Sequence, residues 1–176
     1  MRVSSIPRVL ALAPGTLHLG IALFEGEELI KFGVKTFQGK KSSSTLLPRV
    51  IRFLDELYAA HCPNVLAVEK VFYAQARSSA LLCAEIAAIK RWAEKKGLCL
   101  KQYVPTTVKE YFCEQKRSRR ALAQSVARRY SFLTPYLKSG RTHRAQFYWQ
   151  QMFDAVALGG LALATVSGTV KMPRAR

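Results

Sequence analysis

Acidic residues are scarce in this chain, and the scarcity limits what the protein can bind. Eleven Asp and Glu face 28 Lys and Arg among 176 residues, so the formal net charge is +17 at pH 7. A compact domain with so much positive charge attracts polyanions, and we expect nucleic acid as its first partner, well ahead of an acidic membrane surface. A basic protein that is merely soluble is the alternative on composition alone.

Cysteine pairs at metal-binding spacing are also absent. Cys62, Cys83, Cys99 and Cys113 form no C-x-x-C motif, which argues against a zinc site or a disulfide framework and favours reduced thiols in a cytoplasmic protein. The apolar stretch near the N-terminus is only about five residues long, so we expect no signal peptide. Residues 155–170 are uncharged but short for a membrane span, so we expect no membrane partner.

Neither an internal repeat nor a linker divides the chain, so we expect a single domain over residues 1–176. Apolar runs and turn residues predict strands at 9–12, 19–23, 28–37, 65–69 and 98–103. Apolar spacing predicts helices at 46–58, about 78–96, 107–114, 120–130 and 148–164, with residues 131–147 irregular. This order predicts an α/β fold with a mixed five-stranded sheet and helices on both faces. It is the ribonuclease H-like order, although other α/β folds share it.

Two acidic residues stand apart from the other acids, most of which lie beside basic residues on predicted surfaces. Glu69 ends an apolar strand, and Asp154 lies among apolar and uncharged residues in QQMFDAVALGGLALA. An ionised carboxylate in such surroundings is costly unless a cation or hydrogen bonds compensate it. The residues alone leave two explanations open, a shared cation site or acids that cap a helix or bond within the core.

Four segments taken together resemble the RuvC family of Holliday-junction resolvases: LALAPGTLHLGIAL, VLAVEKVFYAQARSSALL, QYVPTTVKEYF and FDAVALGGLALA. The resemblance implies a ribonuclease H-like homodimer that nicks two opposing strands of a four-way DNA junction, in recombination and repair. It also raises a branch-migration helicase as a candidate partner. Carboxylates of that family bind two magnesium ions, which activate water and stabilise the leaving oxygen.

The four metal-ligand positions implied by the resemblance are only half kept. The family's strand-end glutamate falls on Glu69 and its last aspartate on Asp154, which makes these the candidate catalytic and metal-binding residues. Its first aspartate falls on Ala13, and the remaining acid or histidine falls on Gln151. A single engineered exchange would account for Ala13 but not for Gln151 as well. We therefore expect weakened Mg²⁺ binding and weak or no cleavage.

Two alternatives to a non-cleaving junction-binding protein stay open. The first is a fully active resolvase with an unusual metal site, which a nicking assay on a four-way junction distinguishes. The second is an actin-like ATPase or kinase, because APGT is similar to the phosphate-binding turn of those proteins. The chain lacks the second glycine-rich phosphate loop that such an enzyme needs, and its charge of +17 is unusual for one.

Basic and aromatic residues predict the surface that contacts DNA. Residues 109–144 hold ten Lys and Arg against two acids. Such cations neutralise phosphates, and aromatic rings stack on unpaired bases at a branch point. A solvated helix surface is the alternative for the cations, and a core contact is the alternative for Phe72. The predicted DNA-binding residues are Phe72, Tyr73, Lys109, Lys116, Arg117, Arg120, Arg128, Arg141 and Arg144. Among them, the resemblance places Phe72 at the family's junction-stacking position and Lys109 and Arg120 at basic positions of the family.

Overall fold

The computed structural model describes residues 6–15, 17–39, 42–70, 80–115, 117–139 and 142–169. Three strands come first, followed by a helix, a strand, a helix and a last strand, as predicted, and the remaining elements are helical. In chain order the elements are β1 (Arg8–Ala13), β2 (His18–Glu25), β3 (Glu28–Thr36), α1 (Ser43–His61), β4 (Val65–Glu69), α2 (Ala80–Lys95), β5 (Cys99–Tyr103), α3 (Pro105–Phe112), α4 (Arg119–Arg129), the 3₁₀ helix η1 (Ser131–Leu133), α5 (Thr134–Ser139) and α6 (His143–Val166).

The five strands form one mixed sheet in the order β3-β2-β1-β4-β5, which confirms the predicted sheet. The β1–β2 and β2–β3 pairs are antiparallel, whereas β1–β4 and β4–β5 are parallel. Leu12 of β1 pairs with Val68 of β4. The next residue of each strand, Ala13 and Glu69, therefore lies at the same edge of the sheet.

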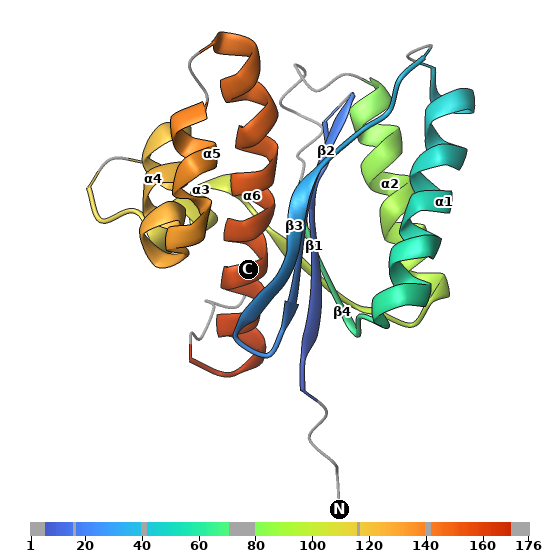
Figure 1. Ribbon diagram of the computed structural model, residues 1–176. Helices are drawn as coiled ribbons and strands as arrows, with labels where there is room; N and C mark the ends of the chain where they lie inside the picture. The colour runs from blue at the N-terminus through green and yellow to red at the C-terminus, as the bar shows by residue number, and fades with distance from the viewer. Residues whose placement is uncertain are drawn as a thin grey trace, which may run out of the picture.

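Helices cover both faces of the sheet, as predicted, with α1 and α2 on one face and α3 to α6 on the other (Figure 1). Alternate residues of β1 belong to different layers of the core, because successive side chains of a strand point to opposite faces. Leu10 and Leu12 pack in the cluster with α1 and α2, while Val9, Ala11 and Ala13 pack in the cluster with α6. Ala13 therefore lies on the face that α6 covers.

The segment 131–147, which we expected to be irregular, is mostly helical, and that expectation is wrong. It holds η1, α5 and the first residues of α6, which begins at His143 instead of near residue 148. Thr142 caps α6, since its Oγ1 accepts a hydrogen bond from the backbone N–H of Ala145 at 3.2 Å. Apolar spacing misses such a helix start, because the first turn of α6 is polar. No helix among the described residues has the length and apolar character needed to cross a membrane.

Candidate active-site pocket

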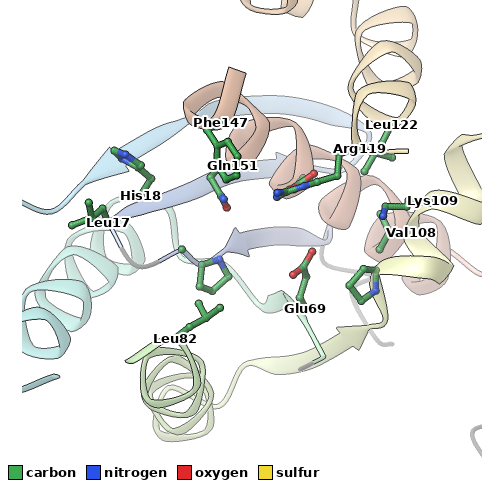
Figure 2. A pocket seen from close by; sticks show the side chains of 14 residues that line it. Leu17, His18, Glu69, Leu82, Val108, Lys109, Arg119, Leu122, Phe147 and Gln151 are labelled. Carbon is green, nitrogen blue, oxygen red and sulfur yellow. The ribbon is translucent and has the colours of Figure 1, made fainter. Parts of the chain in front are cut away.

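A pocket of about 610 Å³ opens where β1 and β4 end against α3, α4 and α6. Its lining includes the Pro14-Gly15 turn and His18, and Glu69 projects from the end of β4. Figure 2 shows the side chains of Glu69, Gln151 and Arg119 directed toward the middle of this pocket. Lys109 of α3 and Asp154 of α6 also line it. The two acids singled out in the sequence thus line one pocket.

Glu69 occupies an environment that favours a neutral carboxyl group. Its pKa is raised to about 7, mainly because burial removes the carboxylate from water and also because the charge of Asp154 lies nearby. The cations of Arg119 and Lys109 act in the opposite direction and lower this pKa. Glu69 therefore interacts electrostatically with Asp154, Arg119 and Lys109.

Asp154 is buried, at 6% exposure, and both of its carboxylate oxygens accept hydrogen bonds from protein donors. Nη2 of Arg119 donates to Oδ2 and forms an ion pair with it. Nε2 of Gln150, one turn earlier on α6, donates to Oδ1 at 2.8 Å. The same amide nitrogen contacts the carbonyl oxygen of Arg119 at 3.2 Å. A cation and hydrogen bonds thus compensate this buried charge, as a carboxylate in apolar surroundings requires.

Arg119 and Gln150 are functional residues that the sequence analysis missed. Arg119 is the first residue of α4, directly after Ser118, whose Oγ accepts a hydrogen bond from the backbone N–H of Ala121 at 3.0 Å. The spacing of buried Leu122 and Val126 was the available signal, since residues 119, 122 and 126 share one face of a helix. Arg120, the predicted residue, instead lines a second hollow together with Tyr136 and Trp149.

Ala13 and Gln151, at the two implied ligand positions that lack a carboxylate, lie where α6 packs on the sheet. Ala13 is 2% exposed and belongs to the apolar core. Its register partner on β2 is Gly20, and the backbone of Gln151 lies so close that a Cβ at Gly20 would be 1.9 Å from the carbonyl oxygen of Gln151. The side-chain amide of Gln151 lies against Gly15, where an added Cβ would be 3.3 Å from Nε2.

The donor set of this pocket does not fit a pair of magnesium ions. Mg²⁺ requires several oxygen ligands with near-octahedral geometry. The pocket offers the carboxylates of Glu69 and Asp154, and the second already binds Arg119 and Gln150. Across the part of the chain that the structure describes, no three His, Cys, Asp or Glu side chains gather to hold a metal ion. Two fixed cations, Arg119 and Lys109, line the same pocket and repel another.

The predicted DNA-binding residues occupy several places. Lys109 lines the pocket with the two acids, and Arg117 is exposed and forms a 2.8 Å ion pair with Glu110. Arg128 lines a third hollow, next to Tyr111 and Phe112. The side chains of Arg120, Arg128 and Arg144 are exposed. Phe72, Tyr73, Lys116 and Arg141 lie outside the described residues.

The known proteins that this chain resembles in sequence share one description. A family model described as crossover junction endodeoxyribonuclease RuvC matches residues 9–134, a segment that includes Glu69 and Lys109 and ends before Asp154. A protein of that description from Gloeobacter violaceus is 25% identical over 142 residues, covering 72% of this chain and 77% of its own length. Another from Akkermansia muciniphila is 29% identical over 107 residues, covering 58% of this chain and 64% of its own.

Solved structures show the same fold. Thermus thermophilus RuvC has a TM-score of 0.66 at 21% identity, with 93% of this chain and 98% of that chain covered. The same protein in complex with a Holliday junction substrate gives 0.67 at 20% identity, with 94% and 98% covered. The yeast mitochondrial Holliday junction resolvase Ydc2 gives 0.62 at 14% identity, with 91% and 80% covered. These likenesses confirm the ribonuclease H-like fold predicted from the order of elements.

Proposed function

The chain belongs to the RuvC family, and from this premise we propose that it binds four-way DNA junctions without hydrolysing them. One observation carries the second half of the proposal. Asp154, the last carboxylate of the family's metal site, is bound on both oxygens by Arg119 and Gln150. Metal-assisted hydrolysis needs ions that activate water and stabilise the leaving oxygen. A pocket with Ala13 and Gln151 at two ligand positions lacks the donors for that step.

Junction binding, in this proposal, draws on positive charge inside and outside the pocket. Lys109 and Arg119 line the pocket, and Arg120, Arg128 and Arg144 have exposed side chains. Cations on several elements contact phosphates of more than one arm, which gives affinity and orientation without reading the sequence. The full set of DNA-binding residues that we propose also includes Phe72, Tyr73, Lys116, Arg117 and Arg141.

The proposal extends to assembly and location. We place the protein in recombination and repair as one RuvC-like domain over residues 1–176, forming a two-fold homodimer through α2, with a branch-migration helicase as a candidate partner. A two-fold assembly matches the symmetry of a junction with two equivalent pairs of arms. A cytoplasmic location agrees with four free cysteines, since reduced thiols are typical of that compartment.

A direct test uses an immobile synthetic four-way junction and a linear duplex of the same length and composition. The protein is expected to bind the junction more tightly than the duplex and to leave both intact in Mg²⁺. Thermus thermophilus RuvC, which has been solved in complex with a Holliday junction substrate, is the positive control for nicking. Equal affinity for the two DNAs contradicts the binding half of the proposal. Robust nicking that Glu69→Gln abolishes contradicts the other half and favours the fully active resolvase with an unusual metal site.

A further inference from the structure

The buried carboxylate of Asp154 is paired with a guanidinium that remains accessible from outside the protein. Asp154 has 8% of its side chain exposed, whereas Arg119 has 47% of its side chain exposed. A guanidinium has five N–H donors, and the bond to Asp154 Oδ2 uses Nη2. Among the described residues, Asp154 is the acceptor that this guanidinium binds, so its remaining donors can bind a ligand that enters the pocket.

The charged side chains that the structure places in this pocket include as many cations as carboxyl groups. Among the described residues, Glu69 and Asp154 share it with Lys109 and Arg119. An oxygen-ligated site for a divalent cation needs an excess of negative charge. The described lining lacks that excess, and Arg119 already supplies a positive charge beside Asp154.

Gln150 also holds the backbone of Arg119 in place. The Nε2 atom of Gln150 bridges the carbonyl oxygen of Arg119 at 3.2 Å and Oδ1 of Asp154 at 2.8 Å. This bridge fixes the start of α4 against α6, so the guanidinium is oriented before any ligand arrives. A planar fork of donors in fixed orientation is the geometry that binds two oxygens of one phosphate.

From these observations we propose that Arg119 takes the place of the divalent cation in this pocket, which thereby binds a DNA phosphodiester directly and without metal. The built-in cation rests on the geometry of Arg119, Gln150 and Asp154 alone. The identity of the anion rests on the proposed function, because a junction is what would bring a phosphodiester to the pocket. The site binds the backbone that the family cleaves, and it holds the phosphate without activating water.

Metal titration tests the built-in cation in the absence of DNA. Calorimetric titration of the full chain with millimolar Mn²⁺, a sensitive substitute for Mg²⁺, is expected to show no saturable binding. Arg119→Ala releases Asp154 and is expected to create one weak saturable site that includes Glu69. Arg119→Gln keeps a hydrogen-bond donor for Asp154 but removes the positive charge. It replaces the alanine variant if that variant does not fold, and it is also expected to create a saturable Mn²⁺ site. Arg128→Ala is the matched control, since it removes an arginine from the same helix outside the pocket and is expected to create no site.

Junction binding tests the anion. Affinity for the four-way junction in EDTA is expected to equal that in Mg²⁺ at matched ionic strength. Arg119→Gln is expected to lower that affinity about five- to tenfold and to reduce the slope of log K against log salt by about one. Arg119→Lys keeps the charge and is expected to retain most of the affinity. Asp154→Asn removes the ion pair with the guanidinium of Arg119, so junction affinity is expected to stay the same or to rise.

Different results overturn different parts of the inference. Saturable Mn²⁺ binding by the unmodified protein, or no gain in either neutral Arg119 variant, overturns the built-in cation. Three results overturn the metal-free phosphate site. The first is a junction affinity that requires Mg²⁺. The others are an affinity that Arg119→Gln leaves unchanged and an affinity that Asp154→Asn lowers. If the unmodified protein does not prefer the junction over the duplex, the proposed function fails, while the metal titration still decides the role of Arg119.

Discussion

The backbone of Gln151 rests directly on Gly20, and only a residue without a side chain permits that approach. A Cβ at Gly20 would lie 1.9 Å from the carbonyl oxygen of Gln151 and 2.3 Å from its carbonyl carbon. Gly20 is the register partner of Ala13, so this contact brings α6 over the end of β1. The distance between the sheet and α6 is therefore fixed beside the pocket, and the side-chain amide of Gln151 is placed against Gly15.

Replacing Gly20 by alanine is expected to destabilise the fold. The new methyl group meets backbone atoms, which cannot rotate away as a side chain can, so α6 must move off the sheet. Overpacking of this kind lowers the free energy of unfolding by about 2–3 kcal/mol. Urea denaturation followed by circular dichroism measures the loss.

Gly160→Ala is the matched control for this prediction. Its Cβ would lie 3.0 Å from Cζ of Phe112, an atom at the end of a ring that can shift. Alanine also gains about 1 kcal/mol over glycine inside a helix, which offsets the contact. The expected stability of Gly160→Ala is therefore close to that of the unmodified protein. A loss as large as that of Gly20→Ala would show that glycine is needed along the whole of α6, and not specifically where Gln151 meets the sheet.

Most of the fold could be predicted from sequence, because strand alternation and helical spacing are local signals. That Glu69 and Asp154 share one site could also be expected from the sequence, since each is an acid in apolar surroundings. The partner of Asp154 could not be. The spacing of Leu122 and Val126 places Arg119 on the buried face of its helix, but no local pattern indicates that its side chain meets Asp154. Arg119 lies 35 positions before Asp154, and only the packing of α4 against α6 brings the two together.

Restoring a metal site is expected to require the removal of Arg119 as well as the addition of acids. Ala13→Asp and Gln151→Asp would supply carboxylates at the two positions that lack them. With Arg119 still bound to Asp154, we expect stronger Mg²⁺ binding but little nicking of a four-way junction. Adding Arg119→Ala frees Asp154, and the triple variant is expected to nick the junction at least tenfold faster than the double variant, about 1.4 kcal/mol in the barrier.

Two further variants control this experiment. Glu69→Gln in the triple variant removes a carboxylate that the ions need, so nicking is expected to disappear. Arg128→Ala in place of Arg119→Ala gives the same net charge but leaves the Arg119–Asp154 pair intact, so nicking is expected not to rise above the level of the double variant. A double variant that nicks as fast as the triple variant would show that the Arg119–Asp154 pair does not block the metal.

Assembly gives a separate prediction. We expect light scattering at micromolar concentration to report the mass of two chains, both free and bound to a junction, because symmetric contact with two pairs of arms needs two copies. Helix α2 is the expected contact, and its Leu81 and Leu82 are only partly buried in the single chain. A one-chain mass in both conditions contradicts the dimer, and Leu81→Asp is expected to produce that mass if the contact lies on α2.

Glu85 is expected to make the stability of the fold depend on pH. This side chain of α2 is 0% exposed, and neither of its carboxyl oxygens has a hydrogen-bond partner among the described residues. Burial raises its pKa from 4.5 to about 7. Between these two values the folded protein holds a proton that the unfolded chain releases, so the free energy of unfolding falls as pH rises through this window. The loss is about 3 kcal/mol and is complete above pH ~7.

The difference between the protein and its Glu85→Gln variant isolates this effect. Gln cannot titrate, so urea unfolding of the variant lacks the Glu85 contribution at every pH. The titration of Glu69, whose pKa is also raised to about 7, is common to both proteins and drops out of the comparison. The variant is expected to gain stability relative to the unmodified protein between pH 5 and pH 8, by about 2–3 kcal/mol. Glu94→Gln, on the exposed side of the same helix, is expected to show no such gain. A constant difference between Glu85→Gln and the unmodified protein across this range would mean that Glu85 is ionised in the folded state and has a partner there.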